Sequence, residues 1–244
     1  MWARSCAIET PGRPRALVLL LAACLCWLAG CSSLVADFKQ ASNFAPPRAG
    51  EPAPEASDPA ATARVLTQGG VVLYFRHART DHTQIERERT ARENGTFSLE
   101  RCETQRNLNE DGRIHFAPVR DAFASMHAGS RPNFSAFWAS AFCRTLETAR
   151  MLTPEPRSFT TLSVEQKDLQ IPERVAKARA FLDEPVPGGQ VKVIVAHAGI
   201  FWAMTGWTVE EGHAVIFVPG QRERIAARLA PPEWEAVARE LAKR

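Results

Sequence analysis

Two arginines and two histidines stand where three apolar segments of the chain end; they are Arg76, His77, Arg144 and His197. An arginine guanidinium grips pairs of anionic oxygens with a planar fork that is always charged. A neutral imidazole carries a ring nitrogen lone pair that can act as a nucleophile. Brought together, these side chains suit the binding and transfer of a phosphoryl group, whose oxygens need fixed positive donors during the reaction.

The segments that precede these residues are predicted as buried strands. Residues 71–75 are five consecutive β-formers after the Gly69-Gly70 break, which is typical of a strand covered on both faces. Residues 138–143 and 191–196 are also apolar, and a helix-like run follows each of them. In an open α/β sheet, ligands bind at the carboxyl ends of the strands. We therefore expect the four side chains to meet at that edge.

The motifs around these residues resemble those of the histidine phosphatase superfamily, which includes phosphoglycerate mutases, acid phosphatases and short phosphohistidine phosphatases. The resemblance rests on four stretches in the family's order: Arg76-His77-Ala78, residues 105–112 (QRNLNEDG), residues 143–149 (CRTLETA) and residues 195–197 (VAH). Several motifs in register are far more specific than one alone. The resemblance covers the chain from Val71 onward and implies an α/β fold, a three-layer α/β/α sandwich with a mostly parallel central sheet.

The resemblance also implies a role for each site residue. His77 would be the nucleophile that forms a phosphohistidine. Arg76 and Arg144 would clamp the phosphate oxygens, and His197 would donate a hydrogen bond to the same group. The implied activity is that of a metal-independent phosphatase, which hydrolyses phosphomonoesters without a cofactor.

Two departures from the family's pattern concern the chemistry. Ala78 replaces the usual glycine, which adds a methyl group where the backbone passes the phosphate. Many members place a glutamate general acid after the strand that follows the second arginine, and here only Glu165 and Asp168 are candidates. Without a dedicated acid, the enzyme would prefer substrates with good leaving groups. The alternative function is a non-catalytic lipoprotein that binds a phosphorylated ligand in a degenerate site.

The N-terminal residues predict export and lipid anchoring. Arg4, Arg13 and Arg15 precede the uninterrupted apolar run of residues 16–28, which is typical of a signal peptide and too short for a membrane span. The sequence Leu-Ala-Gly before Cys31 resembles the lipobox of bacterial lipoproteins, which are cleaved before a cysteine that becomes lipid-modified. A plain signal peptide or a buried N-terminal helix is the alternative.

The predicted domains are a signal peptide (residues 1–30), a lipidated Cys31 with an Ala/Pro-rich tether (residues 31–57) and a phosphatase domain (residues 58–244). Two serines after Cys31 favour the periplasmic side of the outer membrane. The leader holds three of the 30 basic and one of the 27 acidic residues, so the mature chain is nearly neutral and shows no nucleic-acid footprint. The expected partners are the membrane, through Cys31, and a phosphorylated small molecule or envelope sugar phosphate.

Several residues near the motifs leave alternatives open. Residues 83–101 alternate in charge with almost no apolar periodicity, which favours a solvated loop or short surface helix; a mobile lid that supplies one arginine to the substrate is the alternative. Arg106 and Asn107 resemble a family loop near the substrate, without an assigned role. Glu147, three residues after Arg144, is interpreted as a partner that orients an arginine.

Beyond Cys31, the exported chain keeps two cysteines, Cys102 and Cys143. Two remaining cysteines in an exported protein can pair. One alternative is a disulfide that ties the loop at Gln105 and Arg106 to the turn at Arg144, and the other is two buried free thiols.

Hydrophobic periodicity, caps and turn residues predict the remaining elements. These are helices over residues 59–68, 109–127 and 173–182, a strand over residues 159–164, a closing hairpin of residues 214–218 and 225–229, and a C-terminal helix from about Pro232 that presents Trp234, Val237 and Leu241 on one face.

Overall fold

The computed structural model describes residues 57–129, 131–163, 171–221 and 225–244, and the structural statements below concern these residues. The predicted signal peptide, Cys31 and nearly all of the tether lie outside them, as do the acid candidates Glu165 and Asp168. Among the described helices, none combines the length and the apolar composition needed to cross a bilayer.

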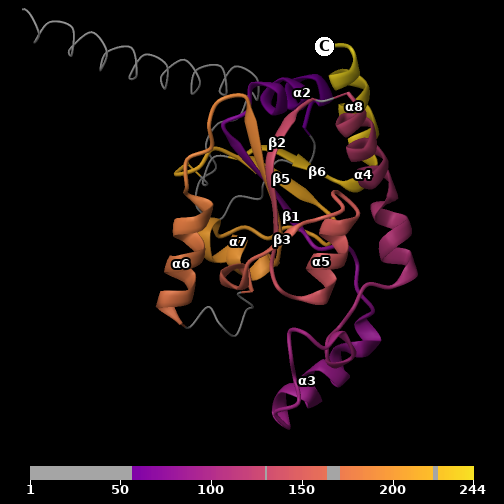
Figure 1. Ribbon diagram of the computed structural model, residues 1–244, viewed down its shortest axis with the longest axis vertical. Coiled ribbons are helices and arrows are strands. Elements are labelled where there is room, and N and C mark those ends of the chain that lie inside the picture. Colours follow the sequence, from indigo (N-terminus) through magenta and orange to yellow (C-terminus); the bar gives the residue numbers. More distant parts are fainter. Residues whose placement is uncertain (1–56, 130, 164–170, 222–224) are drawn as a thin grey trace, which may run out of the picture. The chain divides into compact units, whose positions relative to one another are not determined.

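A six-stranded sheet forms the centre of the fold, in the order β3-β2-β4-β1-β5-β6 (Figure 1). The strands are β1 (Val71–Arg76), β2 (Asn133–Ala139), β3 (Arg157–Ser158), β4 (Gln190–Ala196), β5 (Ala214–Phe217) and β6 (Ile225–Leu229). The four strands from β3 to β1 run parallel, whereas β5 runs antiparallel to both β1 and β6. The predicted mostly parallel sheet is thus confirmed.

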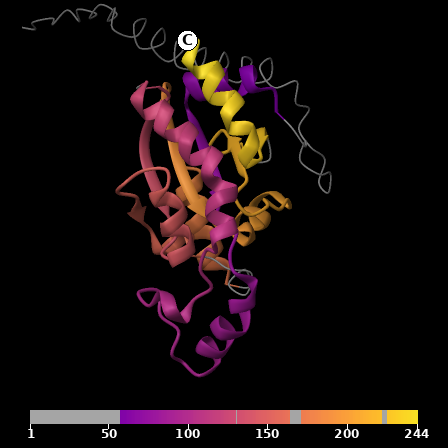
Figure 2. The ribbon, with the colours of Figure 1, turned by 90° about the vertical axis from the view of Figure 1, so that its right-hand side faces the viewer.

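Helices cover both faces of this sheet. The described α-helices are α2 (Pro59–Gln68), α3 (Ile85–Glu93), α4 (Glu110–Ala128), α5 (Cys143–Arg150), α6 (Pro172–Leu182), α7 (Ala198–Thr205) and α8 (Trp234–Ala242), of which α3 lies beyond the end of the sheet (Figure 1). On one face, Phe75 of β1 packs against Phe116 of α4 and Trp234 of α8, and α4 and α8 lie side by side in Figure 2. On the other face, Tyr74 packs against Phe201 of α7, within a core that α6 completes. These layers confirm the three-layer α/β/α sandwich.

The start of α4 is fitted closely against the loop that follows β1. The side chain of Asn109 caps the helix by accepting the N–H of Gly112 at 2.8 Å. A Cβ atom on Gly112 would lie 2.1 Å from the carbonyl oxygen of Arg79. Glycine at this position therefore allows α4 to begin directly against the backbone that leads away from His77.

Most of the predicted elements are present. Helices α2, α4 and α6 and the β5–β6 hairpin match their predicted ranges closely. Helix α8 buries Trp234, Val237 and Leu241, as its apolar face predicted. Alternating burial and helical periodicity were sufficient at these positions because each element rests on the sheet or on a neighbouring helix.

The predicted strand over residues 159–164 is wrong. The two-residue β3 ends at Ser158, before this range, and the described residues 159–163 contain a 3₁₀ turn at Thr160–Leu162 and no strand. Phe159 packs its ring against Trp138 and Phe181, with centroid distances of 5.7 and 4.5 Å. The apolar pattern in this segment therefore reflects burial of single side chains rather than strand pairing.

Candidate active site

A cavity of about 410 Å³ lies at the carboxyl edge of the sheet, and all four residues predicted from the sequence line it. Arg76 ends β1 and His77 follows it, while His197 follows β4. The two strands are parallel neighbours, with Arg76 opposite Ala196, so their ends lie side by side. Arg144 comes instead from the first turn of α5, one connection beyond β2.

Hydrogen bonding fixes the tautomer of His77. The residue is buried, with 2 % of its surface exposed, and its Nδ1 lies 2.8 Å from the carbonyl oxygen of Ala78. A carbonyl oxygen only accepts hydrogen bonds, so Nδ1 carries the proton and Nε2 keeps the lone pair of the neutral ring. Nε2 is therefore the nitrogen that His77 offers to a ligand in the cavity.

Both histidines of the cavity are neutral at pH 7. Burial lowers the pKa of His77 well below its usual 6.5, and the positive charge of Arg144 lowers it further. Burial and Arg144, in the same order, also hold the pKa of His197 well below 6.5. The two rings meet edge to face, with 5.4 Å between their centroids. The neutral state matters because a protonated imidazole has no lone pair with which to attack.

A chain of side-chain hydroxyls holds His197. Its Nε2 lies 2.8 Å from Ser140 Oγ, which in turn lies 2.8 Å from Thr145 Oγ1. Thr145 Oγ1 is 2.8 and 2.7 Å from the carbonyl oxygens of Ser140 and Phe142. Since carbonyls accept, the Thr145 hydroxyl donates to one of them, Ser140 donates to Thr145, and His197 donates from Nε2 to Ser140. The neutral ring of His197 thus keeps its lone pair on Nδ1.

Arg144 is almost fully buried, with 3 % of its surface exposed, and Glu88 and Phe142 are among the neighbours that hold its guanidinium. Nη1 lies 3.3 Å from Glu88 Oε2, and the guanidinium stands 4.3 Å from the ring centroid of Phe142. The hydroxyl of Thr148 donates to the carbonyl of Arg144 at 2.7 Å and accepts the N–H of Ala78 at 3.0 Å. The same threonine therefore ties α5 to the end of β1 and sets Arg144 beside the cavity.

Arg76 is oriented by the segment before β5. Its Nη1 donates to the carbonyl of Val209 at 3.1 Å, and its Nη2 donates to Glu211 Oε1 at 3.2 Å. The hydroxyl of Thr80 donates to the same carboxylate oxygen at 3.1 Å, and Arg106 Nη2 lies 3.8 Å from it. Glu211 thus neutralises part of the arginine charge from outside the cavity lining, a role that no sequence motif signalled.

The sequence left open whether residues 83–101 form a solvated surface segment or a lid that supplies an arginine, and the structure places part of this segment in one wall of the cavity. Residues 85–93 form the short surface helix that was the favoured interpretation, but one face of this helix, α3, lines the cavity with Ile85, Glu88, Arg89 and Arg92. Arg106, from the loop without an assigned role, lines the cavity as well. Residues spaced three and four apart share one helix face. Because this face is mostly charged, hydrophobic periodicity gave no signal.

Glu88 connects α3 to the rest of the site. Its Oε1 accepts from Arg92 at 2.6 Å, and its Oε2 accepts the backbone N–H of Arg106 at 2.7 Å. Burial raises the pKa of Glu88, but Arg144 and the hydrogen bonds from Arg92 and Arg106 outweigh burial, so the net pKa falls below its usual 4.5. Glu88 is ionised at neutral pH and positions arginines instead of carrying a proton.

Glu147 does not orient Arg144, contrary to one reading of the sequence. Its carboxylate pairs with Arg113 of α4 at 2.5 Å, outside the cavity lined by Arg144. Glu147 is thus a partner of Arg113, whereas Arg144 pairs with Glu88.

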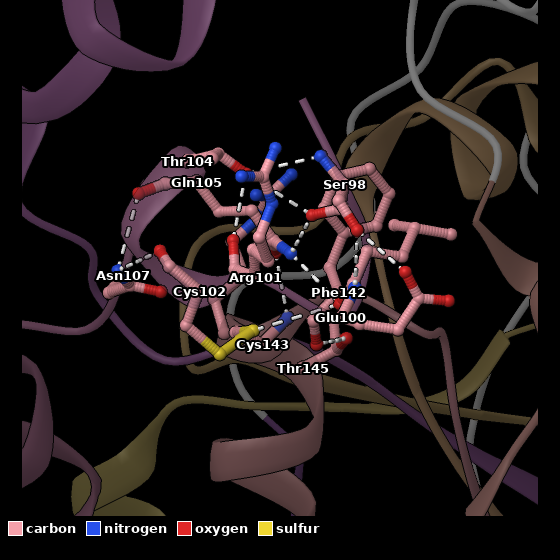
Figure 3. The surroundings of a disulfide bond; sticks show 12 residues. Ser98, Glu100, Arg101, Cys102, Thr104, Gln105, Asn107, Phe142, Cys143 and Thr145 are labelled. Carbon is pink, nitrogen blue, oxygen red and sulfur yellow. Dashed lines mark hydrogen bonds between the residues drawn. A yellow bond between two sulfur atoms is a disulfide. The ribbon is translucent and has the colours of Figure 1, made fainter. Parts of the chain in front are cut away.

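Of the two alternatives left open for the cysteines, the structure shows the disulfide, which joins Cys102 and Cys143. The fully buried side chain of Gln105 lies beside it: Oε1 accepts the N–H of Cys143 at 2.9 Å, and Nε2 donates to two carbonyls of the preceding loop at 2.9 and 3.1 Å (Figure 3). The disulfide and the amide together fix this loop to the start of α5, directly before Arg144.

The arrangement combines an anion clamp with a free imidazole nitrogen. Arg76 and Arg144 supply fixed positive charge, and His77 presents Nε2 in the same cavity. The described part of the chain contains no cluster of His, Cys, Asp or Glu side chains able to hold a metal ion. Because Nε2 of His77 lines the same cavity as the two arginines, a group held there by its anionic oxygens lies within reach of this nitrogen.

Comparisons with known proteins add the following. No family model matches the sequence, and no curated protein matches it. Three similar solved structures are phosphatases by name. The protein histidine phosphatase SixA, complexed with tungstate, is 13 % identical over 67 % of this chain and 98 % of that chain, with a TM-score of 0.43.

The putative phosphohistidine phosphatase SixA from Agrobacterium tumefaciens is 16 % identical, over 66 % of this chain and 99 % of that chain, with a TM-score of 0.40. The mycobacterial glucosyl-3-phosphoglycerate phosphatase, complexed with VO3, is 16 % identical, over 61 % of this chain and 92 % of that chain, with a TM-score of 0.39. At these identities and TM-scores, the likeness assigns neither activity nor substrate to this chain.

Proposed function

We propose that this protein is a metal-independent phosphatase that hydrolyses phosphomonoesters through a phosphohistidine on His77. The observation that supports the proposal most is the state of His77: a neutral ring, with its proton held on Nδ1 by Ala78 and its Nε2 lone pair in a cavity that also contains Arg76 and Arg144. This is the protonation state that attack on phosphorus requires.

The proposed reaction has two steps. In the first, Nε2 of His77 attacks phosphorus, the bond to the ester oxygen breaks, and the leaving alcohol takes a proton from water. In the second, water attacks the phosphohistidine, releases inorganic phosphate and restores the neutral ring. Arg76 and Arg144 stabilise the charge on the phosphoryl oxygens in both steps.

The only carboxylate in the described cavity lining, Glu88, is ionised and engaged with arginines. A leaving group would therefore receive little help from an acid on this wall, and substrates with acidic leaving groups should react fastest. The same observation supports the second candidate function, a non-catalytic lipoprotein that binds a phosphorylated ligand. Whether a phosphoryl group is transferred to His77 distinguishes the two.

A labelling experiment tests this directly. The full chain is mixed with ³²P-labelled para-nitrophenyl phosphate in the presence of EDTA and quenched within milliseconds. We expect acid-labile, base-stable label on the peptide that contains His77, together with steady release of phosphate that EDTA does not reduce. Tight binding of phosphate without label on the chain or turnover would favour the binding protein.

The pH dependence of kcat/KM follows from the lowered pKa of His77. The neutral ring persists below pH 6.5, so we expect activity to stay level as the pH falls through 6.5 and to decline only at lower pH, where His77 gains a second proton. Initial rates with para-nitrophenyl phosphate between pH 4 and 8 measure this, with the ionisation of the substrate followed separately by ³¹P NMR. An acid limb centred at or above pH 6.5 would contradict a desolvated, neutral nucleophile.

We also propose that the chain is exported and tethered to the periplasmic face of the outer membrane by a lipid on Cys31. The support is sequence alone: the basic residues, the apolar run and the lipobox-like residues before Cys31. We expect cells that express the chain to incorporate labelled palmitate into it, and Cys31→Ser to abolish both incorporation and fractionation with membranes. Equal labelling of the Cys31→Ser variant would refute the anchor.

This location motivates an envelope sugar phosphate as the substrate class. Deletion of the gene should then raise the phosphate content of envelope glycolipids, which mass spectrometry of extracted lipopolysaccharide measures. Unchanged phosphate content in the deletion strain would argue for a different phosphorylated molecule.

A further inference from the structure

The cavity holds more positive charge than one phosphate ester needs. Its lining contains five arginines and a single carboxylate, Glu88. A phosphomonoester carries at most two negative charges, which Arg76 and Arg144 can already clamp. Three further arginines, Arg89, Arg92 and Arg106, remain to be explained.

These three arginines come from a different part of the fold than the phosphoryl-binding residues. Arg89 and Arg92 lie on the face of α3 that includes Glu88, and the backbone N–H of Arg106 bonds to Glu88 at 2.7 Å. The phosphoryl-binding residues come from the ends of β1 and β4 and from α5. The extra charge is therefore concentrated on the wall formed by α3 and the Arg106 loop.

Arg92 is engaged within this wall, because it pairs with Glu88 and stacks on Phe97 at 3.6 Å. Arg89 is held less firmly. Its side chain is 63 % exposed, and it pairs with Glu86 and Glu93 of its own helix. Exposed pairs of this kind contribute little to stability, so a ligand can compete for the guanidinium.

Arg106 is also placed to meet a ligand. Its side chain lines the cavity and is 19 % exposed, and its ion pair with Glu211 is long, at 3.8 Å. Its backbone, not its side chain, makes the short bond to Glu88. The guanidinium can therefore turn toward an anion without breaking the contact that holds the loop.

Resting on the proposed phosphatase function, we propose that the substrate carries a second anionic group, phosphoryl or carboxylate, which Arg89 and Arg106 bind while His77 attacks the first. A cavity of about 410 Å³ falls within the usual range for whole small-molecule ligands and exceeds the needs of one phosphate ion. Binding of the second group by Arg89 and Arg106 then determines which substrate is accepted, while His77, Arg76 and Arg144 carry out the phosphoryl transfer.

Binding to the full chain carrying His77→Ala, which removes the nucleophile, tests the inference independently of turnover. Isothermal titration compares glucose 1,6-bisphosphate with glucose 6-phosphate, and 3-phosphoglycerate with glycerol 3-phosphate. In at least one pair, we expect the ligand with the second anionic group to bind about tenfold more tightly than the monophosphate, since one charge-assisted contact is worth that much. The pair that shows the preference identifies the second group as phosphoryl or carboxylate.

In the same background, Arg89→Gln and Arg106→Gln should each reduce the preference severalfold, because they weaken binding of the doubly anionic ligand more than binding of the monophosphate. Glutamine at position 106 keeps the backbone N–H that bonds Glu88. Arg120→Gln is the matched control for loss of one charge, because Arg120 lies on α4 beside Asp121, outside the cavity lining.

Equal affinities within both pairs, or a preference that survives the combined Arg89→Gln and Arg106→Gln substitutions, would overturn the inference. The outcomes also separate it from the proposed function. If phosphohistidine forms but the protein shows no preference for the doubly anionic ligands, this inference is wrong and the proposed phosphatase function stands. If the protein prefers the doubly anionic ligands but never forms a phosphohistidine, the proposed phosphatase function is wrong and the cavity is a binding site for a doubly anionic ligand.

Discussion

His77→Ala is expected to lower kcat/KM for para-nitrophenyl phosphate by roughly 10⁴-fold or more, a loss typical of removing an enzyme's nucleophile. The remaining arginines can still bind the substrate, but no other imidazole nitrogen occupies the place of Nε2. The lone pair of His197 lies on a different atom, Nδ1, because its Nε2–H is donated to Ser140 at 2.8 Å, and we expect it not to replace Nε2 of His77. Steady-state rates of the two purified full-length proteins measure the effect.

His82→Ala provides the control for this experiment. His82 lies five residues after His77, outside the cavity lining, with 65 % of its side chain exposed. Its Nε2 is 3.5 Å from Glu211 Oε2, and Arg76 and Thr80 still hold that carboxylate when this contact is lost. Its replacement should leave kcat/KM within about twofold, as surface substitutions usually do. Thermal unfolding of both variants checks that His77→Ala still folds. Undiminished activity in a folded His77→Ala protein would mean that another group attacks phosphorus.

Cys102→Ser is expected to destabilise the protein by about 4 kcal/mol, because the disulfide closes a loop with a sequence separation of 41. It should also reduce activity, since the bond fixes the loop that carries Arg106 to the residue before Arg144. Urea unfolding with and without a reductant measures the change. The unaltered protein in reductant should resemble the Cys102→Ser variant, which itself should not respond to the reductant.

Two results would contradict this account of the disulfide. The first is a peptide map of the oxidised chain, recorded without reductant, in which Cys102 and Cys143 lie in separate, unlinked peptides. The second is a reduced protein that keeps its full stability and activity. In that case Gln105 alone, through its bond to the N–H of Cys143, would hold the loop.

The sequence predicted the elements that bury a regular apolar face. Residues 71–75 alternate between two covered faces of the sheet, with Tyr74 toward α7 and Phe75 toward α4, so a continuous apolar run was a sufficient signal. The same holds for α8 and its buried Trp234. At the strand ends, motif resemblance located His77 and His197 because each directly follows a predictable strand.

The sequence could not predict contacts made by long-range approach of charged residues. Glu88 and Arg144 are far apart in the chain and meet only when α3 folds over the end of the sheet. The cavity face of α3 is mostly polar because it borders an open cavity rather than a core, so no apolar periodicity reveals it. Ser140 was hidden for another reason: a lone serine in an apolar segment gives no hint that it bonds a histidine 57 positions later.

The hydroxyl chain from His197 runs in one direction only, since its last acceptor is a backbone carbonyl. The arginines of the cavity can only donate, whereas neutral His197 can only accept at Nδ1. A hydrogen bond between a phosphoryl oxygen and Nδ1 therefore needs one proton, carried either by the phosphoryl group or by the ring. In one case the phosphoryl group binds as the monoanion and donates its own proton to Nδ1. In the other case it binds as the dianion while the ring takes up a proton, and His197 then donates from Nδ1, as the family resemblance implies. Phosphate binding at neutral pH would accordingly change the proton count of the solution, so its apparent enthalpy should vary with the ionisation enthalpy of the buffer.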